Sequence, residues 1–116
     1  MINEVKYYIP IKGEKKRIKR TKRINMDEDF CNFTVDEDGF LHSIDDKPAF
    51  LNHSTEIVEW YNHGELHREN HKPARISRTK ISINDPNYPF LDTTEEFYIN
   101  NEIYRKITYD YKGNIK

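Results

Sequence analysis

The feature that most constrains this chain is a repeat, which appears when the sequence is shifted against itself by 25 residues. Residues 39–50 then lie over residues 64–75, and six of the twelve positions are identical: a Gly, a Leu, a His and a Lys-Pro-Ala triplet. A third copy lies 37 residues further on, where residues 96–105 align with residues 59–68, and a fragmentary fourth copy is indicated at residues 109–115. One structural unit is therefore used several times.

Each unit has the pattern of a β-hairpin, in which an aromatic-rich strand is followed by a short turn with Gly or Asn and a second strand. The pattern predicts turns at residues 62–64 and 99–101. The Lys-Pro pairs at residues 47–48 and 72–73 should end strand pairing, because proline has no amide hydrogen. No segment keeps a 3.6-residue apolar period over three turns. We expect an all-β fold with little helix, in which repeated β-hairpins form an antiparallel meander as an elongated sheet or a partly closed roll.

Three further segments complete the expected topology. Residues 5–11 and 14–24 predict two strands joined at Lys12-Gly13, although the second could instead be a basic helix or a mobile arm. Residues 74–83 alternate apolar and polar side chains toward their end and predict a strand with one wet face. Residues 84–89 are dense in turn formers and predict an insertion loop.

A chain of 116 residues has room for one hydrophobic core, so we expect a single domain over residues 1–116. It would comprise a basic N-terminal segment at residues 1–25 and hairpin repeats at residues 34–116. The mean hydropathy is low at -0.99, but aromatic residues make up 13% of the chain and suit a thin sheet. The single cysteine cannot form an internal disulfide, and no apolar stretch follows Met1. We therefore expect an intracellular, cytoplasmic protein of the host cell, without a membrane span or a cofactor.

The second copy resembles the MORN-like repeats of the form WY-x-NG-x-LHRE-x-PA that recur in phage, giant-virus and some bacterial proteins. The matching residues are Trp60, Tyr61, Gly64, Leu66, His67, Arg68, Glu69, Pro73 and Ala74, and the first copy keeps Gly39, Leu41, His42, Pro48 and Ala49. The third copy keeps the aromatic strand but lacks the turn Gly and the Pro-Ala pair. The resemblance implies stacked antiparallel hairpins and a scaffold or interaction role, and it implies no shared catalytic residue. An Ile-, Asn- and Lys-rich composition is also typical of the AT-rich genomes of many such viruses.

Histidines at three regularly spaced positions raise the question of a metal site. His63, His67 and His71 would lie on one face of a helix, where three imidazoles could bind zinc. The predicted turn at residues 62–64 argues against a helix. Since His42 and His67 are equivalent repeat positions, we predict instead that each imidazole forms a hydrogen bond with a neighbouring hairpin.

Cys31 and the acidic runs have simpler explanations than catalysis or ion binding. A cysteine with a distant histidine could act as a nucleophile, but the acids at residues 27–29 would raise the pKa of Cys31. We therefore predict that Cys31 is a small buried hydrophobe. The acidic runs at residues 26–29 and 36–38 lack the spacing of a calcium loop and predict solvated turns or a counter-surface for basic residues. No catalytic residue and no metal ligand are expected.

The charge of the chain is divided unevenly along its length. Residues 1–24 contain nine Lys or Arg against two Glu and carry a charge of +7, whereas the remainder carries -8. An extended basic strand could follow phosphates, with Tyr7 or Tyr8 stacking on a base, or it could be neutralised by the acidic body. The candidate nucleic-acid ligands are Lys15, Lys16, Arg17, Lys19, Arg20, Lys22 and Arg23.

Aromatic side chains on the repeat sheet support a second hypothesis, because exposed aromatic residues are enriched at the centres of protein interfaces. The candidate protein-binding residues are Trp60, Tyr61, Phe97, Tyr98 and Tyr104. We expect a non-enzymatic viral or phage protein that binds and inhibits or redirects a host protein, such as a defence or nucleic-acid-processing enzyme. Nucleic-acid binding through the basic segment is the alternative. Open sheet edges would also allow a symmetric homodimer.

Overall fold

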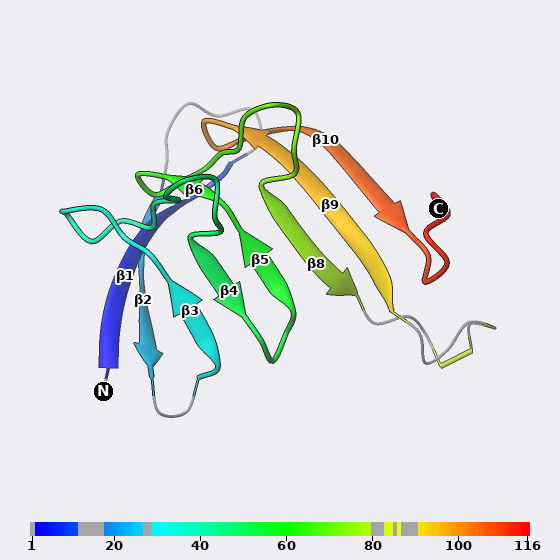
Figure 1. The fold of residues 1–116 in the computed structure, drawn as a ribbon, viewed down its shortest axis with the longest axis horizontal. Coiled ribbons are helices and arrows are strands. Elements are labelled where there is room, and N and C mark those ends of the chain that lie inside the picture. Colours follow the sequence, from blue (N-terminus) through cyan, green and yellow to red (C-terminus); the bar gives the residue numbers. More distant parts are fainter. Residues whose placement is uncertain (1, 12–17, 27–28, 80–82, 85, 87–90) are drawn as a thin grey trace.

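The computed structural model describes residues 2–11, 18–26, 29–79, 83–84, 86 and 91–116, which form ten β-strands and no helix (Figure 1). The molecule is elongated, with principal extents of 47 × 36 × 26 Å. Every pairing between strands is antiparallel. The prediction of an all-β fold made of antiparallel hairpins is confirmed. Within the described residues, no helix has the length and apolarity needed to cross a bilayer.

Most of the chain forms one twisted six-stranded sheet, in the order β10-β9-β8-β5-β4-β3. Its strands are β3 (Cys31–Phe33), β4 (Phe50–Asn52), β5 (Ile57–Glu59), β8 (Arg75–Thr79), β9 (Asp92–Ile99) and β10 (Glu102–Tyr109). Strands that follow one another in the sequence lie side by side in this sheet, so it is a meander. The predicted strand at residues 74–83 corresponds to β8 as far as Thr79. Residues 80–82, 85 and 87–90, and with them most of the predicted loop at residues 84–89, lie outside the described residues.

A small hairpin leaves this sheet between β5 and β8. It consists of β6 (Tyr61–Asn62) and β7 (Glu65–Leu66), and its turn residues His63 and Gly64 both have positive φ, at 45° and 87°. The β9–β10 turn repeats this conformation at Asn100 and Asn101, with φ of 47° and 69°. Two successive left-handed residues match the twist of a tight hairpin. Both predicted turns are confirmed.

The N-terminal segment forms a separate hairpin of β1 (Ile2–Ile9) and β2 (Ile18–Asn25). A helix or a mobile arm is therefore wrong for residues 18–25, while the junction at Lys12-Gly13 lies outside the described residues. Strand β1 crosses the turns of the repeat. The Lys6 amide donates to the Gly39 carbonyl at 2.9 Å, and the Tyr8 amide donates to the Gly64 carbonyl at 2.8 Å.

The hydrophobic core lies between the β1–β2 hairpin and the six-stranded sheet. Val5 and Ile24 are fully buried there against residues of the repeat, including Phe50. Ala49 and Ala74 occupy equivalent repeat positions and have no exposed surface. Each alanine follows Lys-Pro and directly precedes a strand, β4 or β8, and its complete burial leaves no room for a larger side chain. Cys31 is buried in the same cluster, as predicted.

Candidate interaction surface

The hairpins are joined to one another by a repeated set of hydrogen bonds. At the first junction, the turn amide of His63 donates to Nδ1 of His42 at 3.1 Å, and the Gly64 amide donates to the Leu41 carbonyl at 2.7 Å. The Ser43 amide returns a bond to the Tyr61 carbonyl at 2.8 Å. Three main-chain groups of the β6–β7 hairpin are thus satisfied by residues 41–43 of the preceding unit.

The second junction reproduces the first bond for bond. Here the Asn100 amide donates to Nδ1 of His67 at 3.0 Å, and the Asn101 amide donates to the Leu66 carbonyl at 2.8 Å. The Arg68 amide donates to the Tyr98 carbonyl at 3.2 Å. The predicted hydrogen bond between each repeat histidine and its neighbouring hairpin is confirmed. Because Nδ1 accepts in both cases, it carries no proton.

The three regularly spaced histidines do not lie on a helix. His63 is in a turn, stacks on His42 with ring centroids 4.1 Å apart, and places Nδ1 2.7 Å from a carboxylate oxygen of Asp36. His67 is held by the turn of the following hairpin. Among the described residues, no group of three His, Cys, Asp or Glu side chains is arranged to hold a metal ion.

In the third hairpin, the residue equivalent to Leu66 is Ile103. Ile103 lies opposite Tyr98 in the β9–β10 hairpin, as Leu66 lies opposite Tyr61 in the β6–β7 hairpin. Leu41 and Leu66 are 2% and 5% exposed and belong to the hydrophobic core cluster, whereas Ile103 is 38% exposed. An apolar side chain that is an interface residue elsewhere in the molecule is therefore open at this position.

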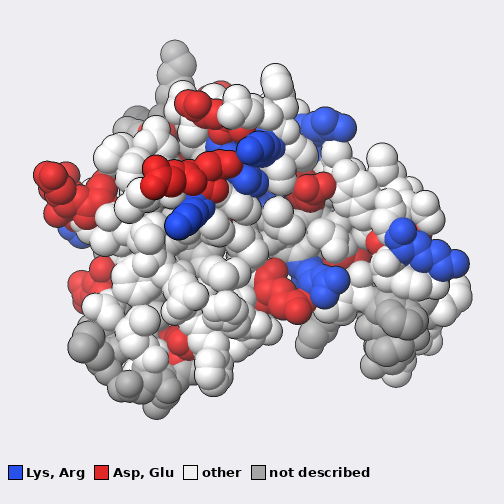
Figure 2. All heavy atoms as spheres, in the orientation of Figure 1, with Lys and Arg blue, Asp and Glu red and all other residues white. Residues whose placement is uncertain are grey.

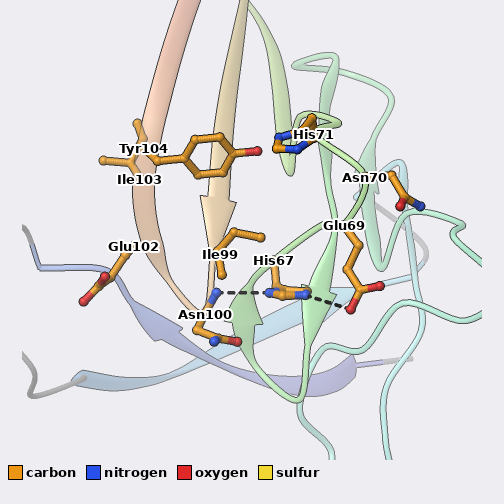
Figure 3. Close-up of a pocket in the computed structure, with 9 residues that line it drawn as sticks. All are labelled: His67, Glu69, Asn70, His71, Ile99, Asn100, Glu102, Ile103 and Tyr104. Atoms are coloured by element: carbon orange, nitrogen blue, oxygen red, sulfur yellow. Dashed lines mark hydrogen bonds and ion pairs between the residues drawn. The ribbon is translucent and has the colours of Figure 1, made fainter.

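A groove of about 870 Å³ runs beside Ile103, between the β9–β10 turn and the loop that follows β7 (Figure 3). Its lining consists of His67, Glu69, Asn70, His71, Ile99, Asn100, Glu102, Ile103 and Tyr104. Tyr104 is 47% exposed, and its side chain points across the groove toward His71. We call this feature the terminal groove. It combines three exposed apolar or aromatic side chains with polar groups at its margin.

The equivalent hollow one repeat earlier has a volume of about 350 Å³ and is bridged by Arg68. The guanidinium carbon of Arg68 lies 3.8 Å from the centroid of the Trp60 ring, and its Nε donates to Asp46 at 3.1 Å. In the terminal groove, His71 stands at the repeat position of Asp46. In the second unit, the chain leaves the hairpin after Leu66 and forms a loop, whereas in the third unit β10 continues along β9 to Tyr109. No loop of the third unit therefore closes the terminal groove.

Four of the five predicted protein-binding aromatics are not exposed. Trp60, Tyr61, Phe97 and Tyr98 are all buried, so the expectation that they line an open surface is wrong. Tyr61 and Tyr98 belong to the core or its edge, and burial, reinforced by Glu96, raises the pKa of Tyr98 to about 12. Only Tyr104 is exposed as expected. Ile99 and Ile103 were not among the predicted binding residues, and His71 was considered only as a metal ligand, although Ile103 could have been found from its alignment with Leu66.

The candidate nucleic-acid ligands that the structure describes lie on β2. Lys19, Arg20, Lys22 and Arg23 are all exposed, whereas Lys15, Lys16 and Arg17 lie outside the described residues. The Lys22 ammonium stands 4.4 Å from the centroid of the Phe50 ring, and Arg23 approaches Glu4 at 3.9 Å. Acidic and basic side chains are intermixed on the face of the molecule shown in Figure 2. Two of the four described cations, Lys22 and Arg23, thus already interact within the chain.

A charged row on the inner face of the sheet was not predicted from the sequence. Glu59, Arg75 and Glu96 lie opposite one another on β5, β8 and β9. Arg75 contacts Glu59 at 3.3 Å and Glu96 at 3.2 Å, although its Nε is not aligned for a hydrogen bond to Glu59. Burial raises the pKa of Glu59, and Arg75 opposes this effect. The row adjoins a cavity of about 320 Å³ and holds three strands in register.

Comparisons of the chain with protein-family models, with curated proteins and with solved structures found no match. Membership of the MORN-like repeat family therefore stays a prediction. The internal evidence for the repeat is independent of any family, because it rests on the equivalent hydrogen bonds of His42 and His67.

Proposed function

We propose that this chain is a non-enzymatic protein-binding module and that the terminal groove is its interface. The observation that carries the proposal is the exposure of Ile103, whose repeat equivalents Leu41 and Leu66 are both buried in the core. Ile99 and Tyr104 also line the groove, and both are exposed. Exposed aliphatic and aromatic side chains around a concave centre are the features that supply most of the binding energy at protein interfaces.

The partner that we propose is a host protein, which the chain would inhibit or redirect inside a host cell. The resemblance to phage and giant-virus repeats supports this choice, as do the intermixed acidic and basic side chains on the face shown in Figure 2. Glu69, Glu102 and His71 at the margin of the groove would set specificity through hydrogen bonds at the rim.

The test compares capture of host proteins by the wild-type chain and by Tyr104→Asp. Phe30→Asp is a matched control, because Phe30 is an exposed aromatic residue that lies just before β3, at the other edge of the sheet. Capture should be lost with Tyr104→Asp and retained with Phe30→Asp. Equal capture by all three chains, each shown to be folded by its circular dichroism, would exclude the groove as the interface.

Nucleic-acid binding through β2 is the second candidate function, supported by four exposed cations on one strand. It predicts that binding to a labelled single-stranded oligonucleotide weakens steeply as salt is raised. The double variant Lys19→Glu/Arg20→Glu should reduce both the affinity and the salt dependence. The matched control is Arg105→Glu/Lys106→Glu, which reverses two cations on β10. Equal effects of the two variants would indicate attraction to net charge alone.

A further inference from the structure

The outer edge of β10 has no strand beside it in the described part of the chain, and a row of charges that crosses the sheet ends there (Figure 1). We propose that this edge binds an extended strand of a partner protein, antiparallel to β10, in which an acidic residue is followed two positions later by an apolar residue. The terminal groove contacts residues 67–71, on the β9 side of the same hairpin. The edge is therefore a second surface, and the inference does not rest on the proposed function.

The direction of the main-chain groups of β10 follows from their partners on β9. The carbonyls of Tyr98 and Glu96 accept hydrogen bonds of 3.2 and 2.9 Å from the second repeat unit, on the side of β9 that faces away from β10. In an antiparallel ladder, such a residue lies opposite one whose amide and carbonyl also point away. Ile103 pairs with Tyr98, and Lys106 pairs with Glu96. The amides and carbonyls of Ile103 and Lys106 therefore point to the open edge.

The C-terminal segment confirms this alternation and limits the open edge. The Lys116 amide donates to the carbonyl of Thr108, two residues beyond Lys106, at 2.9 Å. Within the described residues, no hydrogen bond from outside the β9–β10 hairpin reaches the main chain of Ile103 or Lys106. The β-bulge between them fits this stretch to three residues of a facing strand, as residues 96–98 of β9 show. An added strand can bond to the amide and the carbonyl of both residues.

The charged row of Glu59, Arg75 and Glu96 continues onto β10. Arg75 contacts both glutamates, and Lys106 is the partner of Glu96 on the next strand. The signs therefore alternate across β5, β8, β9 and β10, and the row ends on a cation. Lys106 is exposed and, among the residues that the structure describes, forms no ion pair. Because opposite charges on neighbouring strands attract, an acidic residue continues the row at the next position.

The same edge disfavours a second copy of this chain as the occupant. Antiparallel pairing of two β10 edges would bring Arg105 and Lys106 of both copies together, and like charges on facing strands are destabilising. Both side chains are exposed, and lysine on an edge strand is a common protection against self-association. The charge of the edge therefore favours an acidic strand of a different protein.

The antiparallel direction sets the order of residues in the ligand. The residue opposite Lys106 comes two positions before the residue opposite Ile103, as Glu96 comes before Tyr98 in β9. Side chains of directly opposed residues lie on the same face of a sheet. Since Ile103 is 38% exposed, an apolar side chain opposite it removes this surface from water. The ligand therefore has the pattern acid-x-apolar, which β9 itself carries at residues 96–98.

The experiment uses a fluorescently labelled peptide that copies β9, residues 92–99, and measures its binding to the full chain by fluorescence anisotropy. In the proposed register, the glutamate at position 96 of the peptide faces Lys106. Lys106→Glu should weaken binding by about tenfold, because a cross-strand attraction becomes a repulsion. Lys47→Glu makes the same change of charge in an exposed loop of the first unit and should leave the affinity unchanged. A peptide with lysine at position 96 should bind Lys106→Glu more tightly than the wild-type chain.

Two further peptides test the main-chain contact without altering the protein. N-methylation at position 96 removes the amide hydrogen that faces β10 and should abolish binding. N-methylation at position 97 removes an amide hydrogen that points away from β10 and should leave binding unchanged. A difference between these two peptides is specific to strand pairing, because their side chains and charges are identical.

The outcomes separate this inference from the proposed function, because Tyr104 lines the terminal groove and Lys106 does not. If the β9 peptide does not bind, if both N-methylated peptides bind alike, or if Lys106→Glu and Lys47→Glu bind equally, the inference is overturned. A dimer of the chain that the peptide dissociates would overturn it too, since the edge would then bind a second copy. The proposed function stands in each case if Tyr104→Asp abolishes host-protein capture. Peptide binding as expected, with capture that Tyr104→Asp leaves intact, supports the edge and excludes the groove.

Discussion

Gly64 lies where three segments of the chain meet, and replacing it with alanine should destabilise the fold strongly. A Cβ atom at this position would stand 2.6 Å from Cδ1 of Phe40 and 3.1 Å from Cδ2 of Tyr8. The rings of Tyr8 and Phe40 stack on each other with centroids 5.2 Å apart, so neither can retreat without disturbing the other. The Gly64 backbone is also fixed, because its amide and carbonyl bond to Leu41 and Tyr8.

Gly113 provides a matched control for the conformational part of this effect. Both glycines have φ of 87°, but a Cβ atom at Gly113 would have no neighbour within 4 Å. A left-handed alanine costs about 1–2 kcal/mol at either position. Overpacking should add about 1–3 kcal/mol at Gly64 alone. We therefore expect Gly64→Ala to reduce the free energy of unfolding by about 2–5 kcal/mol in all, which is well beyond the effect of Gly113→Ala.

Urea unfolding followed by the fluorescence of Trp60 measures both variants, because Trp60 is the single tryptophan and is buried. The quantity compared is the difference in free energy of unfolding between the two variants and the wild-type chain. Equal losses for Gly64→Ala and Gly113→Ala would refute the reasoning, since they would mean that Tyr8 and Phe40 do not enclose Gly64.

Three further predictions concern other parts of the fold. Burial, together with the neighbouring His63, lowers the pKa of His42. As the pH falls, His42 therefore takes up a proton in the unfolded chain at a higher pH than in the folded chain. The free energy of unfolding should then decrease as the pH drops below about 6.5. Urea midpoints at pH 7.5 and 5.5 should therefore differ less in His42→Gln than in the wild-type chain. Burial raises the pKa of Cys31, so its reaction with a thiol reagent at pH 8 should be slow in the native chain and fast in urea. Arg68→Gln should shift the emission of Trp60 to longer wavelength, because it removes the guanidinium that covers the ring.

The local features of the hairpins could be predicted from the sequence because each depends on one or two residue types. Paired left-handed residues need Gly, Asn or a similar residue, which places the turns at His63-Gly64 and Asn100-Asn101. The equivalence of His42 and His67 in the repeat predicts equivalent bonds, and both are present. Such inferences need no knowledge of how the hairpins are arranged in space.

The exposure of the aromatic side chains could not be predicted in the same way. A strand has two faces, and the sequence alone does not say which of them another segment covers. Trp60 is covered by Arg68 of its own unit and bonds through Nε1 to the Asp46 carbonyl of the preceding loop. Tyr61 is covered by the β1–β2 hairpin, a segment without a counterpart in the repeat. Burial here is set by contacts between units that lie far apart in the sequence.

The fragmentary fourth copy shows that the hydrogen bonds persist where sequence identity does not. The side chain of Asp36 accepts amide hydrogens from Asp38 and Phe40. The side chain of Asp110 accepts from Lys112 and Asn114 at the same spacing. The bridges are equivalent as well, since Val35 pairs with Leu41 as Tyr109 pairs with Ile115. An aspartate at the start of the turn, and not the overall similarity of the segments, determines this hairpin.

The differences between the second and third hairpins are concentrated on one side. Buried residues keep their character, as Trp60 corresponds to Phe97 and Tyr61 to Tyr98. In contrast, the polar Asn62 and His67 correspond to Ile99 and Tyr104, which both line the terminal groove. If the third hairpin were merely the decayed end of a repeat, its open face would be expected to become more polar, because water covers it. It has become more apolar instead, which is the direction that binding a protein surface requires.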